Sequence, residues 1–167
     1  GALGWLAWPA PALGYGPLRL GMGRAAALRA LGPGALPAPL CAGVEGVMFD
    51  WPDAALCPHP VPAMAMFGAA GGGVSEMQAS LSHPDGGFTA EAWRALVAGQ
   101  AAELGRRCGT APLAGPEEAD MLGAARQWRF RHRSGEVTLA ARWMRRSGAS
   151  FTRLHWLAAG VPAVIEG

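Results

Sequence analysis

The sequence predicts an α+β fold in which two helices pack on one face of an antiparallel sheet. Three observations predict it: segments with helical apolar periodicity, hairpin-type turns between extended runs, and strict apolar/polar alternation toward the C-terminus. A chain of 167 residues, 51% hydrophobic and 16% charged, has the size of one ordinary domain and can bury its own core. We expect a residual signal-like stretch or apolar arm at 1–14 and a single domain at 15–167.

The first half of the chain predicts a short helix followed by strands. Residues 24–31 are rich in Ala and Leu and are followed by Gly32-Pro33, a typical helix stop. Residues 34–40 are Pro-rich, and we expect them to be irregular. Extended runs follow at 46–51, 63–67 and 74–81, and the triple glycine 71–73 predicts a hairpin between the last two.

The second half predicts a longer helix and then a three-stranded meander. Thr89 is a typical N-cap, Phe88 is placed to pack against Trp93, and the helix should end near 105–109. The apolar stripe of this helix comprises Trp93, Leu96, Val97, Ala101 and Leu104. Alternating runs at 126–133, 136–144 and 150–157, separated by Ser-Gly turns, predict three antiparallel strands. The expected order is therefore helix, strands, helix, strands.

Cysteine usage and the N-terminal stretch predict an oxidising compartment. Lys and Asn are absent and Ile165 is the only isoleucine, a bias typical of a GC-rich bacterial genome. The apolar residues 1–8, followed by Pro and Ala, read either as the end of a secretory leader or as an arm packed on the domain. A Cys41–Cys57 disulfide would close a loop of about 15 residues and contribute on the order of 3 kcal/mol, leaving Cys108 as an inert thiol. We therefore expect a periplasmic or secreted protein, with no transmembrane segment because no apolar run approaches about 18 residues.

One short motif resembles a known group of proteins. Residues 16–24, Gly-Pro-Leu-Arg-Leu-Gly-Met-Gly-Arg, precede an Ala/Leu helix ending at Leu31-Gly32, with Cys41 and Cys57 further on. This resembles the opening of small secreted α+β domains of the β-lactamase inhibitor protein and outer-membrane assembly lipoprotein type, although Gly23 stands where Ser or Thr is usual. The resemblance implies a helix packed on an antiparallel sheet, and binding rather than catalysis.

No motif in the sequence predicts a cofactor, a metal or a catalytic residue. Gly21-x-Gly23 imitates a dinucleotide fingerprint, but the strand before it is too short and the later strands alternate as antiparallel ones do. Cys57-x-His59 lies between prolines that explain it as a rigid connector. The net charge of +2 gives no reason to expect nucleic-acid binding.

The charge distribution predicts one candidate surface. Residues 124–167 hold 8 arginines against Glu136 and Glu166, a local net charge of +6. Alternation places the apolar residues of the meander toward the helices and the basic ones on the opposite face. The candidate binding residues are Arg129, Arg131, Arg142, Arg153 and His155. Such a face is either an ordinary solvated surface or a platform for an acidic protein, an anionic ligand or a phospholipid surface.

The sequence leaves three classes of function open. We favour a non-enzymatic periplasmic or secreted binding module that uses the cationic face. The alternatives are a small hydrolase or transferase whose site assembles only in three dimensions, and a structural component of the cell envelope. A pocket holding His83, His132 or His155 hydrogen-bonded to a carboxylate or hydroxyl would favour the enzyme.

Overall fold

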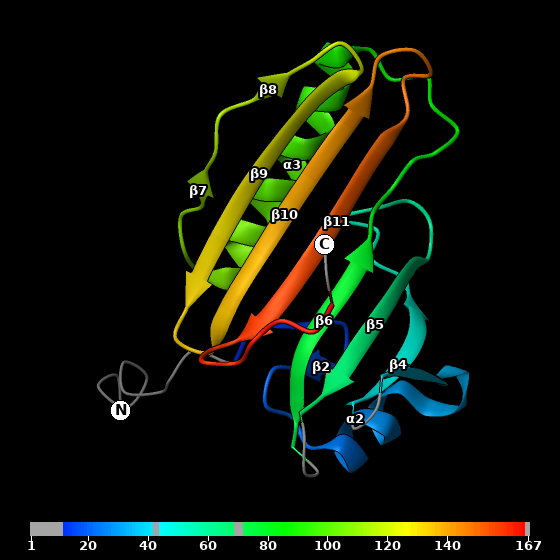
Figure 1. The fold of residues 1–167 in the computed structure, drawn as a ribbon, viewed down its shortest axis with the longest axis vertical. Helices are drawn as coiled ribbons and strands as arrows, with labels where there is room; N and C mark the ends of the chain where they lie inside the picture. Colours follow the sequence, from blue (N-terminus) through cyan, green and yellow to red (C-terminus); the bar gives the residue numbers. More distant parts are fainter. Residues whose placement is uncertain (1–11, 42–43, 69–71, 166–167) are drawn as a thin grey trace, which may run out of the picture.

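The computed structural model describes residues 12–41, 44–68 and 72–165, although not the side chains of 39–41, and shows an α+β fold (Figure 1). Two helices and a large antiparallel sheet make up this part of the chain. The elements are β1 Gly14–Tyr15, β2 Leu18–Arg19, α2 Arg24–Leu31, the 3-10 turn η1 Gly32–Gly34, β3 Leu36–Cys41, β4 Val44–Trp51, β5 Val61–Phe67, β6 Val74–Ser80, α3 Ala90–Cys108, β7 Leu113–Ala114, β8 Glu118–Ala119, β9 Gly123–His132, β10 Gly135–Met144 and β11 Ser150–Ala158.

The main sheet joins the two halves of the chain through one pairing. Its order is β3-β4-β5-β6-β11-β10-β9-β7, with β8 also paired to β9. The hairpin β5–β6 and the meander β9–β10–β11 form as predicted. The link between the halves is β6 with β11, which pairs Ser80 with Arg153 and Gln78 with His155.

The Pro-rich stretch after α2, which we expected to be irregular, is the strand β3 instead. It pairs only with β4 and forms one end of the sheet. A proline has no N–H to donate, so it is tolerated in an edge strand where that position faces away from the neighbour. Pro37 and Pro39 are two residues apart, so their backbone nitrogens face the same edge of β3. The sequence pattern alone did not reveal that this stretch is an edge strand.

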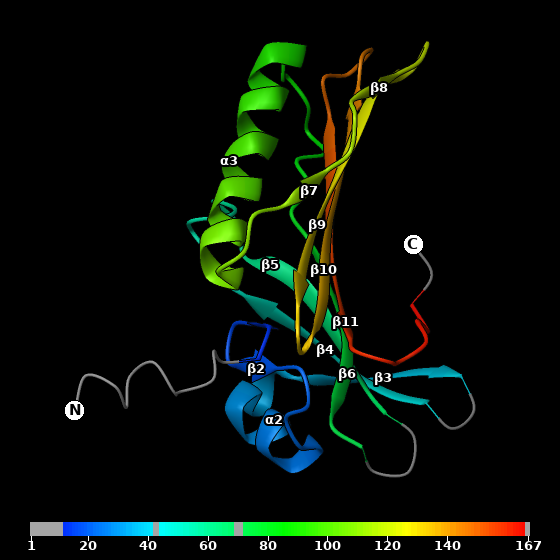
Figure 2. The same ribbon diagram turned by 90° about the vertical axis from the view of Figure 1, so that its left-hand side faces the viewer.

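The core lies between the helices and one face of the sheet. In α3 the predicted cap is present, since Thr89 Oγ1 accepts a hydrogen bond from Ala92 N at 3.1 Å. The predicted stripe points inward, and Trp93 is fully buried. Ala27 of α2 belongs to the same hydrophobic cluster as Trp93. Figure 2 shows α3 against one face of the long strands, whereas no described helix covers the other face.

The predicted Cys41–Cys57 disulfide is wrong. Cys57 is a free, buried thiol in the loop after β4. Cys41 ends β3 opposite Val44, the first residue of the eight-residue β4, while Cys57 lies beyond the other end of that strand. An eight-residue strand spans about 25 Å, and a disulfide requires Cα atoms within about 7 Å. The spacing between Cys41 and Cys57 would suit a closed loop, but the strand β4 lies between the two cysteines and holds them apart.

The first described residues belong to the folded body. Leu13 is buried in the core, and its N–H donates to Ser134 Oγ at 2.9 Å. The predicted leader or arm at 1–14 otherwise falls on residues 1–11, which lie outside the described residues. Among the described helices, none is long and apolar enough to cross a membrane.

Candidate functional site

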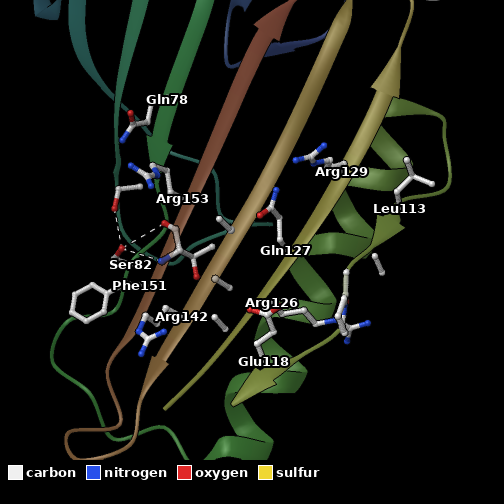
Figure 3. Close-up of a pocket in the computed structure, with 18 of the residues that line it drawn as sticks. Gln78, Ser82, Leu113, Glu118, Arg126, Gln127, Arg129, Arg142, Phe151 and Arg153 are labelled. Carbon is white, nitrogen blue, oxygen red and sulfur yellow. Dashed lines mark hydrogen bonds between the residues drawn. The ribbon is translucent and has the colours of Figure 1, made fainter. Parts of the chain in front are cut away.

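The helix-free face of the sheet carries a groove of about 840 Å³ over β9, β10, β11 and the end of β6 (Figure 3). Small side chains make it hollow: Ala125 of β9 is opposite Arg142, and Ala140 of β10 lies between Gln127 and Arg153. The segment of β7 and β8 forms the outer rim, held to β9 by the hydrogen bond from Gly115 N to Gln127 O at 2.8 Å.

Four of the five predicted binding residues line this groove: Arg129, Arg131, Arg142 and Arg153. The inward partners in the alternation, such as Trp128, Phe130 and Leu139, are buried as predicted. The strands therefore separate apolar and basic residues onto opposite faces, because side chains alternate along each strand.

Three of these arginines have carboxylate partners nearby. Glu136 lies opposite Arg131 in the register and contacts its Nε at 3.3 Å, with Arg129 Nε at 3.9 Å. Asp120 Oδ2 accepts from Arg142 at 3.0 Å, and the pKa of this carboxyl is lowered first by that guanidinium and then by the N–H groups of Gly123 and Leu122. These pairs reduce the mutual repulsion that a purely cationic face would have.

Arg153 is different, because its side chain makes no hydrogen bond or ion pair with any residue that the structure describes. It projects from β11 into the groove between Ala140 and Ser80 and is only partly exposed. The side-chain amides of Gln78 and Gln127, which also line the groove, likewise have no partner in the described part of the chain. The groove therefore presents one guanidinium and two amides that are free to bind.

The fifth predicted residue, His155, is held in a structural contact. Its Nε2 hydrogen-bonds the carboxylate of Glu76, which is 1% exposed. That carboxylate also accepts from Val164 N at 2.8 Å and from Ile165 N at 3.1 Å. The C-terminal segment crosses in front of β11 and β6 in Figure 1, so Glu76 fastens this segment to the sheet. His155 does not line the groove.

An apolar hollow of about 320 Å³ continues the same face over β3, β4 and β5. Gln78 and Ser80 line both hollows, so the two are continuous. Two exposed side chains here are large and apolar, Leu36 at 59% and Met48 at 43% exposure. Sequence reasoning missed this half of the face and the two glutamines. The alternation of Glu76, Gln78 and Ser80 with apolar residues in β6 was the available signal.

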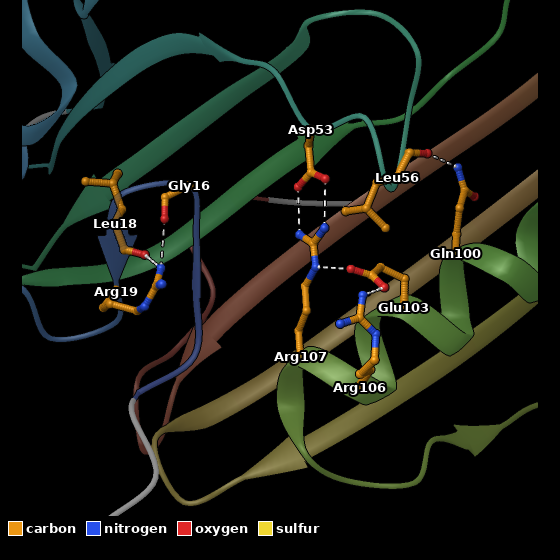
Figure 4. Close-up of polar contacts among 9 residues, drawn as sticks. All are labelled: Gly16, Leu18, Arg19, Asp53, Leu56, Gln100, Glu103, Arg106 and Arg107. Carbon is orange, nitrogen blue, oxygen red and sulfur yellow. Dashed lines mark hydrogen bonds and ion pairs between the residues drawn. The ribbon is translucent and has the colours of Figure 1, made fainter.

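A third hollow of about 520 Å³ lies near the C-terminal end of α3, beside a charged network (Figure 4). Arg107 donates to both oxygens of Asp53 at 2.6 and 2.7 Å and to Glu103 at 2.9 Å. Cys108 lines this hollow, and burial raises the pKa of its thiol, which disfavours the thiolate. The network therefore fixes the helix end to the loop after β4.

The histidines were the residues that could have indicated an enzyme. His132 lines the third hollow and its Nδ1 lies 2.8 Å from Ser134 Oγ, a contact of the kind that would favour an enzyme. Ser134 does not line this hollow, however, and its backbone N–H also donates to His132 Nδ1 at 3.1 Å, so the pair is a local turn contact that presents no hydroxyl to the hollow. Burial, and then the neighbouring His59, lowers the pKa of His83. Among the described residues, no group of three or more His, Cys, Asp or Glu side chains is arranged to hold a metal ion.

Fold and site together define an α+β domain with an open sheet face that is cationic at one end and apolar at the other. Comparisons with protein-family models, with curated proteins and with solved structures found no match.

Proposed function

We propose that this protein is a non-enzymatic binding module whose groove recognises an anionic ligand, foremost an acidic protein segment. The observation that carries the proposal is Arg153, a partly buried residue in the groove whose guanidinium has no partner among the described residues. A cation in a partly desolvated hollow interacts more strongly with an anion than one on an open surface, because water screens it less.

The charge of the lining supports an anionic ligand. One carboxylate, Glu118, is set against five arginines. The arginines are Arg126, Arg129, Arg131, Arg142 and Arg153. Glu136 and Asp120 offset three of them at the two ends. Arg126 donates to Gly115 O and lies over the ring of Trp128, so Arg153 is the one of the five whose side chain has no partner among the described residues. An anion seated there would relieve the remaining repulsion between neighbouring guanidinium groups.

The chemistry of the lining supports binding rather than catalysis. The groove is lined by guanidinium, amide, hydroxyl and apolar side chains, with Glu118 as the one carboxylate. Guanidinium and amide groups recognise carboxylates through directed hydrogen bonds. Of the three hydroxyl residues in the lining, Ser80 and Ser82 hydrogen-bond each other at 3.0 Å and Thr152 is buried, with no histidine in the lining to activate any of them.

The test uses a fluorescein-labelled oligoglutamate peptide and measures its anisotropy with the full chain. We expect binding that weakens as salt rises, and a loss of about tenfold in affinity for Arg153→Gln. The control is Arg29→Gln, which removes the same charge from an exposed position on α2. Equal affinities for the two variants would show that only net charge matters and would overturn the groove as the site.

An extracytoplasmic location is part of the proposal. The buried free thiol of Cys57 removes the disulfide as an argument for it. The remaining argument is the apolar stretch at 1–8. Fractionation of cells that express the native gene should find the protein in the periplasm or the medium; recovery in the cytoplasmic fraction would contradict this part.

A further inference from the structure

We infer that the groove and the apolar hollow together bind one amphipathic helix, with its acidic end over β9–β11 and its apolar end over β3–β5. The inference rests on the proposed function and specifies the partner. Its basis is a row of side chains that runs across the sheet in continuous register. The row comprises Arg129, Thr138, His155, Gln78, Met64, Met48 and Leu36, each paired with the next.

The row changes character from one end to the other. Arg129 in the row and Arg153 in the next row, opposite Ala140, make the first end cationic. Gln78 is the polar centre, where the two hollows meet. Beyond it Met64, Met48 and Leu36 make the other end apolar. Methionine side chains are flexible and adapt to varied apolar surfaces, which suits a docking site.

A carboxylate at the apolar end sets the direction of the partner. Asp50 of β4 lines the apolar hollow, is exposed, and has no ion-pair partner among the described residues. An acidic group over β4 would meet this like charge, whereas the same group over β11 would meet Arg153. Acidic residues are therefore favoured at only one end of the bound segment.

The direction of the row favours a helix over an extended peptide. A strand binds a sheet by pairing along an edge, but an occupant of this row crosses the strands and finds no backbone partners beneath it. It must satisfy its own N–H and C=O groups, as a helix does. Six strand spacings of about 4.8 Å give a span of roughly 29 Å, the length of a helix of about 19 residues.

An anionic lipid offers similar chemistry but fits the face less well. Small ligands bind in sites that bury most of their surface. Here the row lies on an open sheet face, and the C-terminal segment borders it at His155, because the Glu76 carboxylate that holds this segment also hydrogen-bonds His155. An acyl chain on Met48 and Leu36 would remain half in water. A helix needs only one face covered, so the open face suits it.

The probe is a synthetic helical peptide of about 19 residues with glutamates in one half and leucines facing one side of the other half. A second peptide has the same glutamates but glutamine for leucine. Anisotropy with the full chain should show that the first binds more tightly. Met48→Glu should weaken the first peptide by about tenfold and leave the second unchanged, whereas Arg153→Gln should weaken both.

The matched control is Met121→Glu, the same substitution at a 94% exposed methionine outside both hollows. If Met48→Glu impairs folding, judged by circular dichroism, Leu36→Glu at 59% exposure replaces it. Equal binding of the two peptides, or no binding of either, overturns the inference. If the chain binds the two peptides equally but Arg153→Gln still weakens binding, the helix inference fails and the proposed function stands. If Arg153→Gln weakens neither peptide, the helix inference and the proposed function both fail.

Phosphatidylglycerol vesicles distinguish a lipid from a peptide. We expect sedimentation with these vesicles to be no greater than with phosphatidylcholine vesicles. Vesicle binding that both Met48→Glu and Arg153→Gln abolish, together with no preference for the leucine-containing peptide, would show that the face binds lipid and would overturn the helix.

Discussion

At the scale of residues, Glu76 shows how this fold uses a buried charge. The carboxylate is 1% exposed and on the helix-free face, yet its oxygens accept hydrogen bonds from His155 Nε2 and from the N–H groups of Val164 and Ile165. A buried carboxylate is tolerated only with such partners, because desolvation otherwise costs several kcal/mol. Its role is to hold the C-terminal segment on the sheet beside the groove.

We therefore expect Glu76→Ala to destabilise the protein by about 3 kcal/mol, because the substitution removes a buried acceptor that three partly buried or exposed donors share. Urea unfolding measures this, and proteolysis should show earlier cleavage near the C-terminus. Glu45→Ala removes an exposed glutamate paired with Arg24 and should barely move the unfolding midpoint. Similar effects of the two substitutions would contradict the fastening role of Glu76.

At the scale of elements, α3 shows two glycines with opposite requirements. Gly99 lies inside the helix, and Gly109 caps its C-terminus with φ at +66°. A Cβ at either position would meet nothing within 4 Å. Packing is therefore the same for both, and only backbone conformation separates them. Inside a helix alanine is preferred to glycine, whereas the left-handed cap disfavours a side chain.

We expect Gly99→Ala to stabilise the protein by about 1 kcal/mol and Gly109→Ala to destabilise it by about the same amount. Urea denaturation of both variants and of the unmodified chain measures the difference. Shifts of the same sign would mean that Gly109 does not have the left-handed conformation in solution, or that α3 does not extend to Cys108.

At the scale of the whole molecule, a single tyrosine reports on the packing between the N-terminal hairpin and the sheet. Tyr15 of β1 is 2% exposed, and the centroid of its ring lies 5.1 Å from the ring centroid of Trp156. The hydroxyl of Tyr15 has no hydrogen-bond partner among the described residues. Burial, followed by the negative charge of Asp53, raises the pKa of this phenol well above its ordinary value of 10.0. The folded state therefore keeps its proton at a pH where the unfolded chain loses it.

This difference predicts a loss of stability at alkaline pH. Above about pH 10 the unfolded state binds fewer protons than the folded state, so the free energy of unfolding falls as the pH rises. Tyr15→Phe removes this dependence and should be at least as stable at neutral pH, since the hydroxyl is buried without a partner. Tyr15 is the only tyrosine, so phenolate absorbance during the titration reports on it alone. Both proteins keep the same cysteines, and identical alkaline slopes would refute the prediction.

The sequence by itself determined the elements whose signals are local. The cap at Thr89 with the stripe through Trp93 predicted α3, and the alternation of Trp128 with Arg129 predicted the meander and its two faces, because helical and strand periodicities are read within a few residues. Tertiary structure alone decided which groups meet. Three features depend on pairings between distant segments, above all β6 with β11. They are the separation of Cys41 from Cys57, the lack of a partner for the Arg153 side chain beside Glu136 and Asp120, and the row from Arg129 to Leu36. Such pairings depend on how all the strands share one core, which no local pattern encodes.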